Sequence, residues 1–539
     1  MNEFADLVVK VGNSTGTLEK IRAITAYFQK ASDKDKIWTI AIFTGRRPKR
    51  LVNTRQLTEW CKAMSGTPAW LFDECYHTVG DLAETIALLL PAPEHQHELA
   101  PSLSAVAASF IQLRQADENE RKAYVLQCWK QMDKDTRFVF NKLITGGFRI
   151  GVSQRMMVNA LEKITGKPSS QIAWQISGIW DPATISFEEL LSGENILDDP
   201  SKPYPFYLAY QLNLSPGELG DPEDWNAEWK WDGIRGQVIH RKGQLFIWSR
   251  GEELITDKFP ELHALADIIP SGTVLDGELV NIDLSRSTSS KIIPGPFANL
   301  QTRITRKTVS RKQLAEAPVG FIVYDLLEWQ GEDIRNLSIK VRRSLLEQLD
   351  IINQHDHICL SESIAFNTWN ELTILRSQSR ENNSEGLMLK HWDSVYQVGR
   401  KSGDWWKWKI DPLTIDAVMI YAQKGHGRRS NLYTDYTFAV RDGDKLVTFA
   451  KAYSGLTDKE FAEVDAFVKR NSIEKFGPVR TVKPELVFEI AFEGIAASNR
   501  HKSGVAVRFP RISRWRKDKA ANEINTLQDL KELLNTYGQ

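Results

Sequence analysis

The chain has 539 residues, of which 42% are hydrophobic and 26% are charged. This length is too great for one ordinary hydrophobic core and predicts about three domains, and the composition excludes a chain that is mainly disordered. Lysine and arginine number 69, as do aspartate and glutamate, which excludes a uniformly basic surface but allows local basic clusters.

The cellular location is predicted from what the sequence lacks. Residues 1–16 do not have the basic and then apolar pattern of a secretory signal, and no apolar run reaches the length of a membrane span. The 4 cysteines are far apart, which predicts neither a zinc site nor a disulfide framework. The sequence therefore predicts a cytoplasmic protein with no membrane partner.

The pattern along the chain predicts a multidomain protein. Residues 1–200 carry apolar residues at spacings of three and four, as in DLAETIALLL, which predicts an all-α domain. Beyond the prolines near 200–209, short alternating runs mix with helical patterns, which predicts an α+β domain over 201–410. Residues 411–539 are typical of a small β domain with a hairpin turn at Asp442-Gly443, and a five-stranded OB-fold barrel suits them.

The sharpest motif lies in the middle region, where Lys230-Trp231-Asp232-Gly233 stands at the end of an expected strand. Such a string is weak evidence alone, but ordered companions follow it. They are Ser249-Arg250-Gly251, Asp276-Gly277-Glu278-Leu279, Tyr324-Asp325, EGLMLK at 385–390, Lys407-Trp408-Lys409 and Arg508-Phe509-Pro510-Arg511. In order and spacing this set resembles the ATP-dependent DNA ligases, which belong to the covalent nucleotidyltransferase superfamily.

The resemblance implies that Lys230 is the catalytic nucleophile that carries AMP. A lysine amine attacks phosphorus only when it is neutral, which desolvation or neighbouring cations such as Lys407 and Lys409 favour. The cofactors expected are ATP, as the AMP donor, and Mg²⁺ or Mn²⁺. Glu385 is the best candidate metal ligand, with Asp232 as a second, because phosphate-bound divalent ions take one or two protein carboxylates.

The resemblance also assigns the nucleotide pocket. Glu278 would contact the ribose, and Tyr324 would stack on adenine, where other family members often have Phe. Glu228 would help to seat adenine. The α-phosphate would be approached by Lys390, Lys407 and Lys409, and the phosphates of ATP or the 5′-phosphate of the nick by Arg235 and Arg250.

The two ends of the chain suggest DNA as the partner. Residues 142–161, with 43–48 and 79–89, resemble the helical DNA-binding domain of larger ATP-dependent ligases. We expect Arg46, Arg149 and Gly151, together with Arg235, to contact DNA, since glycines beside arginine allow backbone to approach phosphates. The alternative for this stretch is a plain turn between packed helices. The basic clusters at 45–50, 306–312 and 508–519 are otherwise ordinary solvated surface.

At the other end, RFPRISRWRKDK resembles the C-terminal motif of the family. Arg508 and Arg511 would orient the departing pyrophosphate, with Arg514 and Arg516 as weaker candidates. The C-terminal domain would close for adenylation and then swing away, and a monomer would encircle nicked duplex DNA. The architecture resembles bacterial or archaeal forms, which suggests a bacterial, nucleoid-associated enzyme.

Other interpretations remain open. Each motif taken singly is also compatible with a turn, a core residue or an exposed strand face. An RNA ligase or a capping guanylyltransferase uses the same lysine chemistry, and a catalytically dead nucleic-acid scaffold would keep the fold. ATP is expected rather than NAD, because the zinc-binding cysteine cluster of NAD-dependent ligases has no counterpart among the 4 cysteines.

Overall fold

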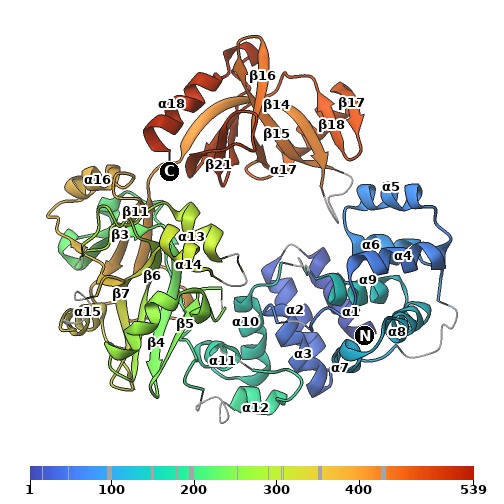
Figure 1. Cartoon of the computed structure of the whole chain (residues 1–539), viewed down its shortest axis with the longest axis horizontal. Coiled ribbons are helices and arrows are strands. Elements are labelled where there is room, and N and C mark those ends of the chain that lie inside the picture. Colours follow the sequence, from blue (N-terminus) through green and yellow to red (C-terminus); the bar gives the residue numbers. More distant parts are fainter. Residues whose placement is uncertain are drawn as a thin grey trace. The chain divides into compact units, whose positions relative to one another are not determined.

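The structure is a computed structural model, shown in Figure 1, that describes all residues except 15, 47, 94–99, 147, 149–150, 178–179, 193–198, 252, 289–290, 305, 307–308, 350–354, 426–431 and 539. Its contacts divide the chain into two units. The first comprises Met1–Gly166, Pro182–Phe187 and Pro412–Gln539, and the second Lys167–Asp181 and Glu188–Asp411. No helix in these described ranges is long and apolar enough to cross a bilayer.

The N-terminal region is helical, as predicted. Its helices are α1 (Asn2–Asn13), α2 (Thr17–Phe28), α3 (Asp33–Phe43), α4 (Thr54–Ser65), α5 (Ala69–Val79), α6 (Leu82–Leu89), α7 (Leu103–Gln112), α8 (Glu118–Gln131), α9 (Lys134–Thr145) and α10 (Gln154–Thr165). Side-chain caps fix where several begin: Asp133 accepts a hydrogen bond from the Thr136 amide and Ser153 from the Met156 amide. Helix α9 packs against α1 and α6, and α10 against α2.

Two short helices follow, α11 (Ser169–Ile176) and α12 (Phe187–Ser192). Helix α11 follows the N-terminal helices in sequence, yet its residues belong to the second unit. The ring of Trp174 stacks on that of Tyr204 with 4.9 Å between centroids, and Gln175 donates a hydrogen bond of 2.6 Å to the carbonyl of Leu191. The stacking of Trp174 on the buried Tyr204 attaches α11 to the second unit.

The second unit contains two main sheets. The first has five strands in the order β10 (Ser363–Ile364), β3 (Trp225–Trp231), β11 (Ser384–His391), β13 (Trp405–Lys409) and β2 (Tyr210–Gln211). The second has six strands, with β5 (Gln244–Ser249), β4 (Ile234–Arg241), β6 (Thr273–Asn281), β7 (Val319–Trp329) and β8 (Glu332–Asp333) in order and β9 (Ile358–Leu360) beside β7. Strands β1 (Tyr207–Leu208) and β12 (Gly399–Arg400) form a separate pair, and the helices are α13 (Phe297–Ile304), α14 (Arg311–Glu316), α15 (Ile339–Glu347) and α16 (Trp369–Ser377). The expected α+β domain is thus confirmed.

The C-terminal region is rich in strands, as predicted. Its main sheet has seven strands: β16 (Lys445–Ala452), β15 (Tyr433–Asp442), β14 (Leu413–Lys424), β18 (Val479–Val482) and β17 (Ser472–Phe476) in order, with β19 (Val487–Phe492) between β14 and β22 (Arg511–Trp515). Strands β20 (Gly494–Ala497) and β21 (Val505–Arg508) pair separately, and the helices are α17 (Asp458–Asn471) and α18 (Leu527–Tyr537). The β15–β16 hairpin turns at Gly443-Asp444, one residue after the expected Asp442-Gly443, because Asp442 still pairs with Lys445. The β17–β18 hairpin adds strands beyond the five expected.

Candidate functional site

Four of the expected nucleotide-binding residues, Glu228, Lys390, Lys407 and Lys409, lie with Lys230 on one face of the five-stranded sheet. Because side chains alternate along a strand, Trp225, Ala227 and Trp229 of β3 point into the apolar core on one side. The intervening residues of β3 face the other way, and so do the paired positions of β11 and β13. These positions are Asn226, Glu228, Lys230, Met388, Lys390, Trp405, Lys407 and Lys409.

An irregularity in strand pairing brings Glu385 to Lys230. Ser384 pairs with Trp231 and Leu387 with Trp229, so Glu385 and Gly386 of β11 together oppose Lys230 of β3. This is the arrangement of a β-bulge, which redirects a side chain at a strand end. Gly386 has φ +135°, and a Cβ there would lie 2.3 Å from the carbonyl oxygen of Trp408, so only glycine fits.

Lys230, Glu385 and Lys409 form an ion-paired cluster. The Nζ of Lys230 donates a hydrogen bond of 2.6 Å to Oε2 of Glu385, and the Nζ of Lys409 lies 3.2 Å from the same oxygen. Burial opposes ionisation of Glu385, but the two ammonium groups outweigh it and lower its pKa from 4.5 to about 2. The stability that this depressed pKa contributes is present above pH 4.5 and is lost as the pH falls toward 2.

Lys407 lies beside this cluster, and Arg250 and Asp232 are on the loops around it. Burial lowers the pKa of Lys407, and the nearby cations Arg400, Lys409 and Lys230 lower it further. Arg250 is exposed after β5, and Asp232 is partly exposed after β3. The cluster is therefore rich in positive charge, as a site for a triphosphate requires.

A second group of polar contacts, centred on Glu228, lies further along the same face of the sheet. Its carboxylate is buried and accepts hydrogen bonds of 3.1 Å from the Lys390 Nζ on both oxygens. The same Nζ lies 4.5 Å from the centre of the Tyr324 ring. Lys390 thus links Glu228 of β3 with Tyr324 of β7, the two residues expected to contact adenine.

The approach of the two sheets depends on Gly233. A Cβ at this residue would lie 2.2 Å from the carbonyl oxygen of Leu279 in β6, so a larger residue would push the loop after Lys230 away. The neighbouring Glu278 faces Lys230, Arg235, Arg250 and Glu385. The Asp-Gly of the lysine motif is therefore more than a plain turn.

The guanidinium of Arg235 is bonded to other groups of the protein, unlike that of an arginine left open to bind phosphate. It forms two hydrogen bonds, of 3.2 and 2.7 Å, with the buried carboxylate of Asp276. It also donates to the carbonyl of Tyr207 at 2.6 Å and to the hydroxyl of Tyr396 at 3.3 Å. Asp276 belongs to the Asp276-Gly277-Glu278-Leu279 motif but had no expected role, although its place opposite Gln237 in the β4–β6 ladder sets it beside Arg235.

The pKa of Glu278 can be tested through the pH dependence of the protein's stability. Burial raises its pKa from 4.5 to about 8, against the opposing effect of Lys230, Arg235 and Arg250. Because the unfolded chain loses this proton near pH 4.5 and the folded chain keeps it until about pH 8, stability falls as the pH rises through that window. We expect Glu278→Gln to raise the thermal midpoint relative to wild type more at pH 8.5 than at pH 4. Calorimetry at both pH values measures it, and an equal change at both would contradict the raised pKa.

The basic C-terminal residues lie in the other unit. Arg511 is ion-paired with Glu493 at 2.9 Å and Arg514 with Glu489 at 3.1 Å. Arg508 ends β21, and its guanidinium lies 5.0 Å from the ring of Phe509. Arg516 is held by the buried Asp416 at 2.7 Å and by Asp518 at 2.7 Å, contacts that fix the turn after β22.

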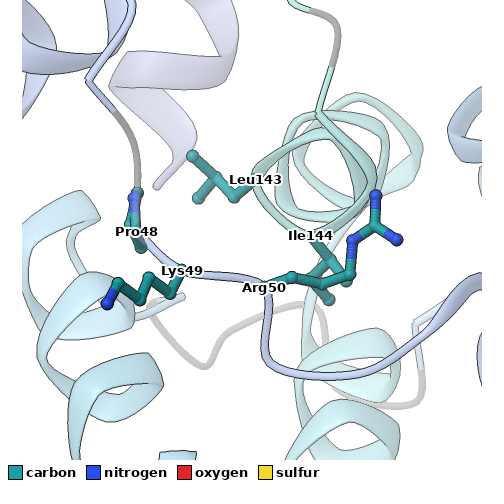
Figure 2. Close-up of a pocket in the computed structure, with 5 residues that line it drawn as sticks. All are labelled: Pro48, Lys49, Arg50, Leu143 and Ile144. Atoms are coloured by element: carbon teal, nitrogen blue, oxygen red, sulfur yellow. The ribbon is translucent and has the colours of Figure 1, made fainter. Parts of the chain in front are cut away.

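The residues expected to bind DNA are only partly described. Arg149 lies outside the described residues. Gly151 is described, and its carbonyl accepts a hydrogen bond of 3.0 Å from the Lys20 Nζ, while Arg46 donates one of 2.9 Å to the hydroxyl of Thr44. A pocket of about 270 Å³ in the helical region is lined by Pro48, Lys49, Arg50, Leu143 and Ile144 (Figure 2). It lies between residues 48–50 and the end of α9, and none of the expected ATP-binding residues lines it.

Comparison with known proteins identifies three successive family segments. They are DNA ligase N terminus over residues 1–162, ATP dependent DNA ligase domain over 217–409 and ATP dependent DNA ligase C terminal region over 429–519. The chain is 29% identical to a probable DNA ligase of Koribacter versatilis, over 96% of this chain and 93% of that protein. It is 25% identical to DNA ligase 1 of Korarchaeum cryptofilum, over 99% of this chain and 98% of that protein.

A solved structure named Pmar-Lig_PreS3 has a similar fold. Its TM-score is 0.59 at 15% identity, and the match covers 95% of this chain and 99% of that one. The family segments follow one another in the order of the helical, α+β and strand-rich regions, and the α+β segment contains the Lys230 cluster. The chain therefore belongs to the ATP-dependent DNA ligases.

Proposed function

We propose that this ligase seals nicks between a 5′-phosphate and a 3′-hydroxyl in duplex DNA, with AMP carried on Lys230. The observation that carries the proposal is the hydrogen bond of 2.6 Å between Lys230 and Glu385, within a cluster that also holds Lys409 and Lys407. The amine is thus positioned at a bulge, on rigid strands, beside the positive charge that a triphosphate needs.

The reaction proceeds in three transfers. Lys230 loses its ammonium proton to solvent, and the neutral amine attacks the α-phosphorus of ATP. A P–N bond forms, the nitrogen gives up a second proton, and the bond to the β-phosphate breaks to release pyrophosphate. An oxygen of the 5′-phosphate of the nick then attacks the same phosphorus and takes the AMP, while the P–N bond breaks and the lysine nitrogen regains its protons from solvent. Finally the 3′-hydroxyl attacks the 5′-phosphate, loses its proton and expels AMP. Lys409 and Lys407 stabilise charge on the phosphate oxygens throughout.

The chain's own residues also suit a divalent ion. Mg²⁺ and Mn²⁺ prefer carboxylate oxygen and bind nucleotides through one or two protein carboxylates. Glu385, on β11, and Asp232, two residues after Lys230, would hold the ion, and the lowered pKa of Glu385 indicates that its carboxylate is ionised. The ion would supply charge neutralisation at the triphosphate.

Adenine would lie between the two sheets, against the Tyr324 ring and beside Glu228 and Lys390, whose Nζ is bonded to Glu228. Glu278, on β6, would bind the ribose. Arg235 is committed to Asp276, so we infer that the exposed Arg250 is the arginine that meets the 5′-phosphate of the nick. Arg235 would then act mainly by holding this wall of the pocket.

Nicked duplex DNA would be held by a monomer that encircles it. Arg46, Gly151 and Arg149 would contact phosphates from the helical region. Affinity that rests on phosphate contacts falls steeply with added salt, because each contact releases condensed counterions.

The proposal is tested by labelling the protein with [α-³²P]ATP and chasing with unlabelled nicked DNA. We expect one equivalent of label on the protein, its transfer to the DNA 5′ end and its release as AMP on sealing. Parallel reactions with GTP and with nicked RNA distinguish the RNA-directed enzymes. Label that never forms, or that moves only to RNA, would contradict the proposal.

The C-terminal motif gives a prediction about a single step. We expect Arg508→Ala to slow self-adenylation by about ten-fold or more, because the arginine would orient the departing pyrophosphate, while sealing of pre-adenylated DNA changes little. Single-turnover rates on the two substrates measure the difference. Arg500→Ala, which removes an exposed arginine of the same domain, is the control. Equal losses in both steps would argue against a role confined to adenylation.

A further inference from the structure

Asn226, Glu228 and Lys230 form a row of side chains on one face of β3, here called the Lys230 row. Its inner end contains a buried hydrogen-bond acceptor that the proposed chemistry does not use. Asn226 lies on the same face of β3 as Glu228 and Lys230, two and four residues before them, and is 1% exposed. Successive positions on this face are roughly 6–7 Å apart along the strand. The row therefore runs from the phosphate end at Lys230 inward to Asn226.

The orientation of the Asn226 amide follows from its one partner. The Nδ2 group donates a hydrogen bond of 2.8 Å to Oε1 of Glu228, and a carboxylate oxygen can only be met by the N–H end of an amide. The carbonyl Oδ1 consequently faces elsewhere. It forms no hydrogen bond with any residue that the structure describes.

A neighbouring group also lacks a hydrogen bond. Arg343, from α15, places Nη1 at 3.7 Å from Oε1 of Glu228, and within the described residues this nitrogen has no hydrogen-bond partner either. Its other nitrogens are engaged, with Nε donating to Glu347 at 2.7 Å and Nη2 to the carbonyl of Ser361 at 2.6 Å. Buried polar atoms are almost always satisfied, because leaving one unpaired is costly. The buried polar groups around Glu228 can therefore form hydrogen bonds with one more polar partner.

We propose that Asn226 accepts a hydrogen bond from the 6-amino group of the purine base and selects ATP against nucleotides that lack this donor. The inference rests on the proposed transfer of AMP to Lys230. An amino group has two N–H donors, so it can bond to Asn226 Oδ1 and Glu228 together. Guanine carries a carbonyl oxygen at the same carbon, which would set acceptor against acceptor.

The first test uses the wild-type chain alone. The mass of the protein is followed after reaction with ATP, GTP and purine riboside triphosphate, which has hydrogen in place of the 6-amino group. We expect kcat/KM for adduct formation to be about ten-fold or more higher with ATP than with the purine analogue, since the analogue leaves a buried acceptor unpaired. Equal values for these two nucleotides would overturn the inference.

Two variants separate direct contact from an effect through Glu228. Asn226→Leu removes the acceptor and the Nδ2 donor, and we expect the preference for ATP over the purine analogue to fall severalfold, to the part that Glu228 supplies. Asn226→Asp loses the donor to Glu228 but keeps an acceptor, so adduct formation slows while the preference remains. Loss of the preference in both variants would mean that Asn226 acts only by positioning Glu228, and would overturn direct contact.

Asn281→Leu is the matched control. Asn281 is a buried asparagine of β6 that donates a hydrogen bond of 2.9 Å to the carbonyl of Pro318, away from the Lys230 row. We expect it to keep the wild-type preference, and thermal midpoints check the folding of all three variants. If the wild type forms no adduct with any triphosphate, the proposed function fails as well; if it forms one whose preference is unchanged by Asn226→Leu, only the inference fails.

Discussion

Lys230→Ala is expected to abolish self-adenylation. The amine is the atom that forms the P–N bond, and the other lysines of the cluster, Lys407 and Lys409, stand on a different strand, so neither can replace it at the bulge opposite Glu385. Loss of a nucleophile lowers a rate by roughly a thousand-fold or more. The label retained by the protein after reaction with [α-³²P]ATP measures the loss.

A second substrate shows whether the loss is specific to that first step. Lys230→Ala is expected to keep part of its sealing activity on DNA that already carries the 5′-adenylate, since that step does not use the amine as nucleophile. Lys340→Ala removes an exposed lysine of the same unit and should label like wild type. Normal labelling of Lys230→Ala would show that another residue carries AMP.

Glu385→Gln is expected to slow self-adenylation by about 100-fold or more. The amide keeps the shape of the side chain but removes the negative charge that pairs with Lys230 and Lys409 and that would hold a divalent ion. Labelling rates across a Mg²⁺ or Mn²⁺ titration measure both effects. We expect the variant to need more metal for half-maximal labelling.

The control for this variant is Glu362→Gln. Glu362 is ion-paired with Lys291 at 3.0 Å and its side chain is 65% exposed, so it tests the loss of a glutamate charge outside the cluster. The control is expected to match wild type in rate and in metal requirement. If Glu385→Gln behaves like Glu362→Gln, Glu385 is neither a metal ligand nor an essential partner of Lys230.

Much of the fold was predictable because it rests on local patterns. Apolar spacings of three and four in α6 and α10 follow from one helix face being buried, and a hairpin within one residue of Asp442-Gly443 follows from the positive φ that a tight turn needs at glycine. The packing of α11 with the second unit was not predictable. It depends on the stacking of Trp174 on Tyr204, a pair set by tertiary contact rather than by any local pattern.

The sequence alone determined the three-part architecture, the family and the set of charged residues that stand as candidates, since residue type and order along the chain carry these. Only the tertiary structure decided which of them meet. The bulge at Glu385-Gly386 puts a carboxylate against Lys230, and Asp276 takes the guanidinium of Arg235. Such pairings join strands far apart in the chain, and their geometry depends on strand register and on the burial of charge, neither of which a linear motif specifies.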